Sequence, residues 1–328
     1  MSRVVSRIAR TAGCVISAAG LTAALTLGTA AHAVDSLKIL VPANPGGGWD
    51  QTGRAMQQVL QSSGLVKSIQ VDNKGGAGGT IGLAQFVSSA KGDGNAIIVS
   101  GLVMVGAIIT NKSPVNLSQV TPIARLTGEF EVIAVPANSP LKSMDDLMQA
   151  WKKDPGKMAW AGGSAGGTDH ITVGMLAKVG GVDATKINYV AHSGGGEAVA
   201  QLLGGHLPVG VNGYAEFQAQ IDAGKLRALG ISSPKRLPGV NIPTFMEQGI
   251  KVEIANWRGV FGAPGITAAQ QKDLAAMVDK MVKTPAWQEI LKKNSWADFY
   301  LTGDAYAKYV VSENERVGAI LKDIGLVK

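Results

Sequence analysis

The stretch LKILVPANPGGGWDQT, residues 37–52, decides the fold expected for this chain. Its apolar start predicts a short buried strand that ends at Pro42. Glycines 46–48 follow, and beyond Asp50 apolar residues recur at helical spacing. The first amides of a helix have no partner inside it, and its N-terminus carries partial positive charge. This strand, glycine turn and helix therefore predict a binding place for a small carboxylate.

A second stretch, KMAWAGGSAGGTDHI at residues 157–171, repeats the same sequence of strand, glycine turn and helix start. Thr168 or Asp169 is suited to cap the helix, and the hydroxyls of Ser164 and Thr168 can donate hydrogen bonds. We expect this turn to face the first one from another domain, with the carboxylate between them. The alternative is a glycine-rich turn that binds nothing.

The alternation of predicted elements gives the architecture. Strands and helices alternate through residues 37–110 and again through 131–231, which predicts mainly parallel sheets with helices on their faces. Residues 255–262 are predicted to cross back, and the remainder of the chain is predicted to be almost all helix. We therefore expect an α/β fold of two lobes joined by crossings near 133 and 255. Lobe 1 is predicted to hold residues 34–132 and 255–328, and lobe 2 residues 133–254, with a ligand cleft between them.

Residues 1–33 are typical of a cleaved secretory signal peptide. Three arginines precede an apolar run of small residues, and Ala31-His32-Ala33 fits a cleavage site. A retained membrane anchor is the first alternative, although polar residues interrupt the apolar run. A lipoprotein is the second, although the residues before Cys14 lack the usual aliphatic side chain. We expect the mature chain to be secreted across a membrane.

Composition excludes several classes of function. The only cysteine, Cys14, lies in the predicted signal peptide, so the mature chain has neither a disulfide nor a thiolate. Loss of the three N-terminal arginines lowers the net charge from +7 to +4. The basic residues are scattered and not interleaved with aromatics, so we expect no nucleic acid as partner. The glycine loops lack the Lys-Ser/Thr ending of a phosphate loop, and no two histidines of the mature chain have helical metal spacing, so we expect neither cofactor nor metal.

Several further residues have two interpretations each. Asp50 either serves as the N-cap of its helix or accepts a hydrogen bond from a ligand hydroxyl, amide or ammonium. Residues 192–197 form a third glycine turn before a helix, so His192 and Ser193 are further candidates. Arg258 either holds a carboxylate or forms a structural pair. The residues predicted to bind the ligand are Asn44, Gly47, Gly48, Trp49, Asp50, Asn73, Ser164, Gly167, Thr168, Asp169, His170, His192, Asn212 and Tyr214.

One motif favours an enzyme instead. Gly162-x-Ser164-x-Gly166 matches the nucleophile elbow of α/β-hydrolases, which lies between a strand and a helix. Such an enzyme also needs an acid and then a histidine downstream, on one long central sheet. The predicted two-lobed context does not fit, so a secreted serine hydrolase that uses Ser164 is the alternative function.

At this point the residues resemble a known family, the extracytoplasmic solute receptors of tripartite tricarboxylate transporters, often called the Bug family. The resemblance covers essentially the whole mature chain. It rests on PGGGWD at 45–50, NKGGAGG at 73–79, residues 162–170, AVAQLLGG at 198–205, AGKLRALGI at 223–231, Lys235-Arg236, IPT at 242–244 and WRGVFGAPGIT at 257–267.

The resemblance implies a periplasmic Venus-flytrap protein, similar to type II binding proteins, with two hinge crossings and no catalytic residue. It implies a carboxylate held between the two glycine loops largely by backbone amides and water, and delivery to large and small membrane subunits. The first loop is similar to the branch named for tricarboxylates, which suggests citrate. We expect a monomer. A receptor that passes its bound form to a sensor kinase is the third alternative.

Overall fold

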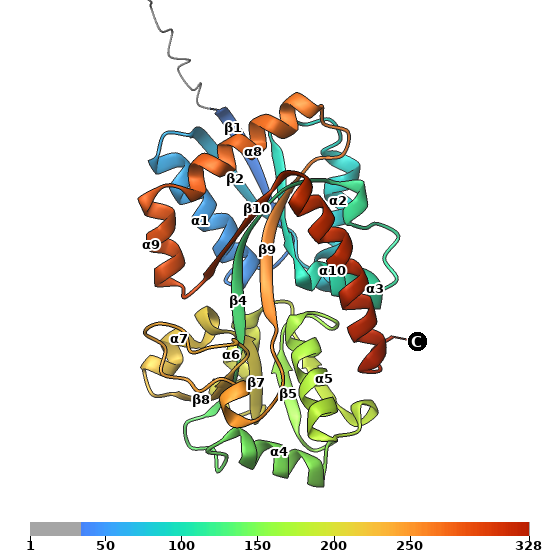
Figure 1. Ribbon diagram of the computed structural model, residues 1–328, viewed down its shortest axis with the longest axis vertical. Helices are drawn as coiled ribbons and strands as arrows, with labels where there is room; N and C mark the ends of the chain where they lie inside the picture. The colour runs from blue at the N-terminus through green and yellow to red at the C-terminus, as the bar shows by residue number, and fades with distance from the viewer. Residues whose placement is uncertain (1–33, 328) are drawn as a thin grey trace, which may run out of the picture. The chain divides into compact units, whose positions relative to one another are not determined.

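The computed structural model describes residues 34–327 (Figure 1). The predicted signal peptide and its cleavage after Ala33 lie outside the described residues. Within residues 34–327, no helix has both the length and the apolarity needed to cross a membrane.

The helices are α1 (Gly48–Ser62), α2 (Thr80–Ser89), α3 (Leu102–Thr110), α4 (Met144–Lys153), α5 (Thr168–Gly180), α6 (Gly195–Leu203), α7 (Tyr214–Asp222), α8 (Ala268–Val282), α9 (Pro285–Lys293) and α10 (Gly303–Asp323). The strands are β1 (Val34–Val41), β2 (Val66–Asn73), β3 (Ala96–Gly101), β4 (Thr121–Pro136), β5 (Ala159–Gly162), β6 (Asn188–Ala191), β7 (Val209–Gly213), β8 (Leu226–Ile231), β9 (Ala255–Gly262) and β10 (Ala297–Thr302).

The first group of strands has the order β2-β1-β3-β9-β4, with β10 also on β4. β1 is parallel to β2 and β3, whereas β9 is antiparallel to both β3 and β4. The late strand β9 therefore lies between two early strands, so the two ends of the chain build this part together. Buried side chains from residues 37–126 and 254–324, with Ile171, form its core.

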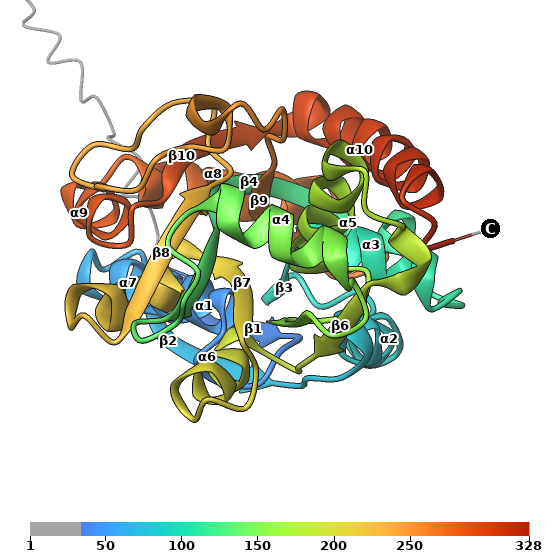
Figure 2. The ribbon, with the colours of Figure 1, turned by 90° about the horizontal axis from the view of Figure 1, so that it is seen from below.

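The second group is built around β5, β6, β7 and β8. β5 is parallel to β6 and β7, while β7 and β8 are antiparallel to β4. Ile133 and Val135 of β4 join the core under α4 and α5, whereas Val132 and Ala134 join the core under α6 and α7. Alternate side chains of a strand point to opposite faces, so helices cover both sides of this sheet (Figure 2).

β4 belongs to both groups. Thr121–Phe130 pairs with β9, and Glu131–Pro136 pairs with β7 and β8, so the change of partner falls between Phe130 and Glu131. Figure 1 shows β4 and β9 running side by side from one group of elements toward the other. We call the part around β1–β3 lobe 1 and the part around β5–β8 lobe 2. The predicted lobe boundaries at 132/133 and 254/255 stay a prediction.

The predicted order of elements is confirmed, with three differences. β4 begins at Thr121, ten residues before its predicted start, and β10 lies between two predicted helices, where no strand was predicted. The first sheet is also mixed and not mainly parallel, because β9, β4 and β10 are antiparallel to their neighbours. The first half of β4 carries Pro122, Arg125 and Gly128, which hid its strand character, since such residues are depleted in strands or interrupt the apolar alternation.

Candidate ligand-binding site

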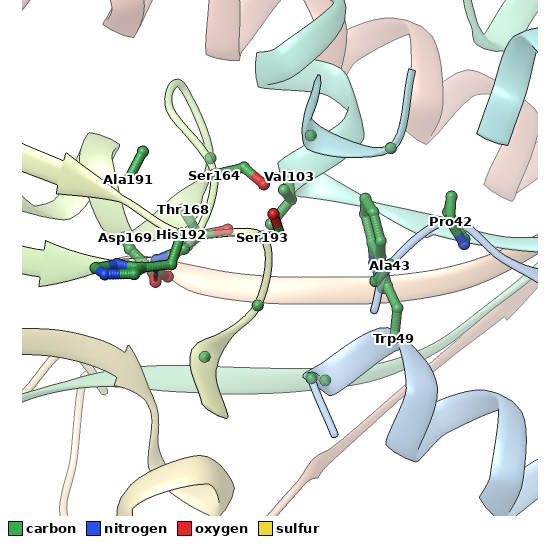
Figure 3. A pocket seen from close by; sticks show the side chains of 18 of the residues that line it. Pro42, Ala43, Trp49, Val103, Ser164, Thr168, Asp169, Ala191, His192 and Ser193 are labelled. Atoms are coloured by element: carbon green, nitrogen blue, oxygen red, sulfur yellow. Dashed lines mark hydrogen bonds between the residues drawn. The ribbon is translucent and has the colours of Figure 1, made fainter. Parts of the chain in front are cut away.

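A cavity of about 360 Å³ lies where residues of both lobes meet. Figure 3 shows Trp49 on one side of it and Ser164, Thr168 and His192 on the other. Its lining residues are Pro42, Ala43, Gly47, Gly48, Trp49, Gly76, Ala77, Gly78, Gly79, Val103, Asn111, Gly163, Ser164, Ala165, Gly167, Thr168, Asp169, Ala191, His192, Ser193, Gly194, Gly195, Glu197, Asn212, Glu216, Asn256 and Arg258.

Three helix N-termini meet at this cavity. α1, α5 and α6 begin after Gly47, Gly167 and Gly194, and none of these cap residues supplies a side-chain hydrogen bond to the helix. The first amides of each helix are consequently free of a side-chain cap, and each helix end carries partial positive charge. Their convergence gives the cavity hydrogen-bond donors from both lobes, which suits an anionic group.

An acidic residue in the first turn of each helix braces its glycine loop. The Gly46 amide donates to Asp50 Oδ2 at 3.0 Å, the Gly163 amide to Asp169 Oδ2 at 2.6 Å, and the Ser193 amide to Glu197 Oε2 at 3.1 Å. The loop amides before the helices are therefore used to shape the loops, and the first amide of α1, that of Gly48, faces the carboxyl group of Glu216.

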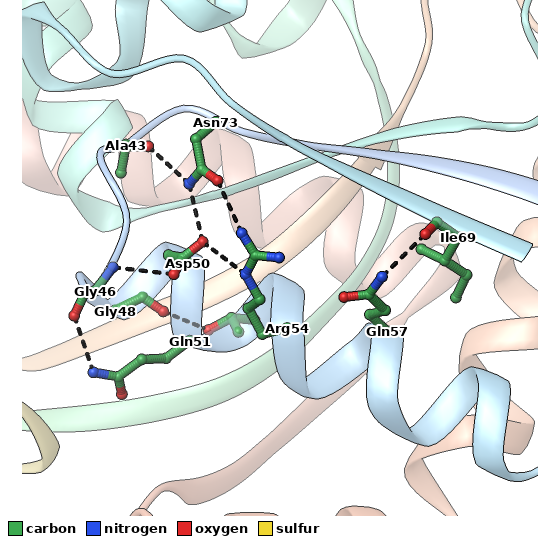
Figure 4. Close-up of polar contacts among 10 residues, drawn as sticks. Ala43, Gly46, Gly48, Asp50, Gln51, Arg54, Gln57, Ile69 and Asn73 are labelled. Atoms are coloured by element: carbon green, nitrogen blue, oxygen red, sulfur yellow. Dashed lines mark hydrogen bonds and ion pairs between the residues drawn. The ribbon is translucent and has the colours of Figure 1, made fainter.

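The first loop is also tied to β2. Asp50 Oδ1 accepts hydrogen bonds from Asn73 Nδ2 at 2.9 Å and from Arg54 Nε at 3.3 Å (Figure 4). Asn73 Nδ2 also donates to the Ala43 carbonyl at 3.1 Å. Asp50 and Asn73 thus hold the loop in place, and neither lines the cavity.

His170 has a similar supporting position under the second loop. Its Nδ1 accepts the Gly166 amide at 3.2 Å, and its ring stacks on Tyr189 with centroids 4.1 Å apart. Burial lowers the pKa of His170 to about 4, so the ring is neutral at physiological pH. The Tyr189 hydroxyl donates to the Gly163 carbonyl at 2.8 Å, which fixes the start of the same loop.

A hydrogen bond joins the two lobes beside the cavity. Asn44 Nδ2, on the first loop, donates to Glu197 Oε1 of α6 at 3.3 Å. On the lobe 2 side, His192 Nδ1 lies 3.0 Å from the Gly162 carbonyl, and Asn212 Nδ2 donates to the Gly195 carbonyl at 3.1 Å.

The inner wall of the cavity carries a buried charged group. Arg258 on β9 is 2% exposed and pairs through Nη2 with Glu129 on β4, which is 1% exposed. Glu129 Oε1 also accepts the Ala215 amide at 2.8 Å. The interpretation of Arg258 as half of a structural pair thus has direct support, although Arg258 also lines the cavity.

Three more carboxyl groups surround this pair. Burial, together with the Glu129 carboxylate, raises the pKa of Glu216 to about 8. Burial likewise raises the pKa of Asp169 to about 6, even though the Gly163 amide opposes the shift. Burial and the neighbouring carboxylates of Asp169, Glu129 and Glu216 raise the pKa of Glu131 well above its usual range.

The predicted site residues divide into two sets. Gly47, Gly48, Trp49, Ser164, Gly167, Thr168, Asp169, His192 and Asn212 line the cavity. Asn44, Asp50, Asn73, His170 and Tyr214 do not; the first four support the loops, and Tyr214 is 5% exposed within the core of lobe 2. Residues absent from the predicted set include Gly78, Asn111, Gly194, Glu197, Glu216, Asn256 and Arg258. The glycine turn at 192–197 signalled Gly194 and Glu197, whereas Glu216 and Asn256 carry no motif.

The predicted nucleophile elbow, Gly162 to Gly166, runs from the last residue of β5 toward the start of α5. Ser164 lies in a loop four residues before α5 begins, and no hydrogen bond within residues 34–327 joins its hydroxyl to a histidine. In the same part of the chain, no group of three His, Cys, Asp or Glu side chains is arranged to hold a metal ion.

Comparison with known proteins agrees with this architecture. The model of the tripartite tricarboxylate transporter family receptor matches residues 53–326. Protein BugT of Bordetella pertussis is 27% identical over 330 residues, which covers 98% of each chain.

Two solved structures share the fold. The periplasmic binding protein BugD superposes with a TM-score of 0.81 at 23% identity, over 90% of this chain and 99% of BugD. MatC from Rhodopseudomonas palustris with bound malate superposes with a TM-score of 0.77 at 22% identity, over 88% of this chain and 99% of MatC. Because the family model matches most of its length, the chain belongs to the tripartite tricarboxylate transporter receptor family and is of the Bug type.

Proposed function

We propose that this chain is a periplasmic receptor that binds a small organic acid, a di- or tricarboxylate, in the cavity between its lobes. Membership of the receptor family and the malate bound to MatC support a carboxylate as ligand. The observation that carries the proposal is the convergence of the uncapped α1, α5 and α6 N-termini on one cavity.

The mechanism follows from the origin of these donors. α1 belongs to lobe 1 (34–132 and 255–328), whereas α5 and α6 belong to lobe 2 (133–254). An anion that accepts hydrogen bonds from both lobes is bound more tightly when they are close together, so binding favours the closed arrangement. We propose that this closed form is recognised by the large and small membrane subunits of a tripartite transporter.

Titration calorimetry and thermal unfolding test ligand binding. The purified mature chain is titrated with succinate, malate, aspartate, adipate, tricarballylate and citrate. A true ligand at one hundred times its dissociation constant stabilises the protein by about 2.7 kcal/mol and raises its Tm. Absence of heat and of any Tm shift with every organic anion would contradict the proposal.

Ser164→Ala separates receptor from hydrolase. The Ser164 hydroxyl lines the cavity, so its loss is expected to weaken carboxylate binding several-fold while the fold is kept. A hydrolase would instead show ester turnover that this substitution abolishes. Ser118, exposed and remote from the cavity, provides the matched control Ser118→Ala.

Uptake of the labelled ligand by cells with and without this receptor then distinguishes transport from delivery to a sensor kinase.

A further inference from the structure

The carboxylates that brace the glycine loops before α1 and α6 each have a second partner. In both cases one oxygen accepts a loop amide, and the other accepts the amide group of an asparagine side chain. Asp50 accepts from Asn73 at 2.9 Å, and Glu197 accepts from Asn44 at 3.3 Å. A side-chain donor therefore fixes each of these two carboxylates from behind, in addition to the loop amide that the carboxylate holds.

Behind Asp169, which braces the second loop, lies the carboxyl group of Glu131. Glu131 is 0% exposed on β4 and does not line the cavity. Its main chain is fixed by Ser232, whose Oγ accepts the Glu131 amide at 2.8 Å and whose own amide donates to the Glu131 carbonyl at 2.9 Å. The side chains of Glu131 and Asp169 are in hydrogen-bond contact, which two carboxyl groups can form only when one of them carries a proton.

The hydrogen bonds around the pair decide which carboxyl group carries the proton. Asp169 is favoured as the carboxylate, because the Gly163 amide donates to it at 2.6 Å and it lies in the first turn of α5. Within residues 34–327, by contrast, no N–H group donates to either carboxyl oxygen of Glu131. A buried carboxylate without donors is costly, so Glu131 is favoured as the protonated acid.

The other ionisable groups that face Glu131 agree with this assignment. They are Glu129, Tyr189, Glu216 and Arg258. Arg258 is the cation of this set, and it is already paired with Glu129. A negative charge on Glu131 would therefore meet other carboxyl groups in a buried place, without a cation of its own.

We propose that Glu131 holds a proton and donates a hydrogen bond to Asp169, and that it is thereby a positioning residue of the second glycine loop. It acts through Asp169 and not on the ligand. Its effect on affinity rests on the proposed function, whereas its proton and its support of the loop can both be measured without a ligand.

Infrared difference spectroscopy tests the proton directly. The C=O stretching band of a protonated carboxyl group is separate from the bands of a carboxylate. The spectrum of Glu131→Gln at neutral pH is expected to lack a protonated-carboxyl band that the unmodified mature chain shows. Glu315→Gln, on the exposed face of α10, is the control and should lose carboxylate bands instead. Loss of carboxylate bands in Glu131→Gln, as in the control, would overturn the proposal.

Two variants test the support of the loop. Glu131→Gln keeps a donor, so its affinity for the tightest-binding acid is expected to stay within about threefold of that of the unmodified protein. Glu131→Met removes the donor at similar side-chain length. It is expected to weaken binding by about tenfold or more and to speed hydrogen exchange of the amides in residues 162–168.

The outcomes separate this proposal from the proposed function. Unchanged loop exchange in Glu131→Met, or equal losses in the Gln and Met variants, would overturn the role of Glu131 and leave carboxylate binding intact. If no acid binds the unmodified protein, the proposed function fails, and the infrared band and loop exchange still decide the role of Glu131. If Glu131→Met does not fold, the infrared band and the retained affinity of Glu131→Gln decide it.

Discussion

Gly48 is held closer to its surroundings than the other glycines of the first loop. A Cβ added at Gly48 would lie 2.0 Å from Arg258 Nη2 and 2.5 Å from its Cζ, whereas one at Gly47 would meet nothing nearer than 3.8 Å. Arg258 is buried and paired with Glu129, so it has little room to move. Packing against Arg258 therefore requires glycine at position 48, whereas the φ angle of this residue does not.

Gly48→Ala is therefore expected to destabilise the fold by about 1–3 kcal/mol and to abolish ligand binding, because overpacking displaces either the helix start or the ion pair. Gly47→Ala, in the same loop, is expected to change the free energy of unfolding by about 0.5 kcal/mol at most. Urea unfolding of both variants checks this. Equal effects of the two substitutions would contradict the packing argument.

The carboxyl of Glu216 is expected to make stability depend on pH. Its folded pKa is about 8, above the ordinary value of 4.5, so between these values the folded chain holds a proton that the unfolded chain releases. Stability then falls as the pH rises across this window. Protonation of His170 in the unfolded chain lowers stability only below about pH 6.5, so it does not contribute between pH 6.5 and 8. Glu131, whose pKa is also raised well above its usual range, acts in the same direction as Glu216, so the Glu216→Gln variant is needed to separate the two.

Glu216→Gln keeps a neutral side chain at all pH values. Its Tm is expected to rise relative to that of the unmodified protein between pH 6.5 and 8. Glu315→Gln on the exposed face of α10 is the control and should give a constant difference. Thermal unfolding at several pH values measures both, and parallel curves for the protein and its Glu216→Gln variant would refute the expectation.

At the scale of elements, one buried hydrogen bond joins α10 to β9. Trp257 Nε1 donates to Glu313 Oε2 at 2.8 Å, and Glu313, 4% exposed, also accepts from Arg316. Glu313→Ala would leave the indole N–H buried and unpaired, which costs about 1–3 kcal/mol. Glu313→Gln retains an acceptor and should lose less, and Glu315→Ala should lose about 0.5 kcal/mol or less. Chemical denaturation ranks the three; a loss with Glu313→Gln as large as with Glu313→Ala would contradict the role of this hydrogen bond.

The elements that were predicted correctly are those whose pattern of apolar residues, or whose glycine turn, is visible within the segment itself. The strand at β3, AIIVSG, is buried at every position, and the glycine turns before α1 and α5 mark their helix starts. β10 could not be predicted in this way, because ADFYLT is only partly buried and becomes a strand by pairing with the edge of β4. That edge exists only after distant parts of the chain have come together.

At the scale of the whole molecule, the residues of the site also divide into those with a local sequence signal and those without one. The glycine loops indicate Gly47, Gly48, Ser164 and Thr168, since free helix amides need a glycine-rich turn before the helix. Glu216, Asn256 and Arg258 carry no such local signal, because they reach the cavity from the ends of α7 and β9 through the tertiary arrangement. The role of Asp50 as a loop brace likewise depends on Asn73, 23 residues away.

The contact between lobes offers a prediction of its own. A Cβ added at Gly106 of α3 would lie 1.9 Å from the carbonyl oxygen of Gly166 in the second loop. Gly106→Ala is therefore expected to hold the lobes apart and weaken ligand binding at least tenfold, since both lobes must reach the anion. Calorimetry measures the affinity, and small-angle scattering should give a larger radius of gyration in the presence of ligand.

Gly318→Ala in α10 is the matched helical control, because its Cβ would meet only Ile109 at 3.7 Å. It should bind ligand normally and gain up to about 1 kcal/mol from helix propensity. Normal binding by Gly106→Ala would show that the closeness of α3 to the second loop is not needed.

The insertion of β9 between β3 and β4 has a consequence for biosynthesis. Consider a nascent chain that has emerged from the ribosome only up to α7. It contains β3 and β4, the two neighbours of β9, but not β9 itself. The first sheet then exposes two unpaired edges, which favour aggregation. This protein must therefore finish its first lobe after translation has passed residue 262, and a prematurely terminated product lacking β9 should depend on chaperones to stay in solution.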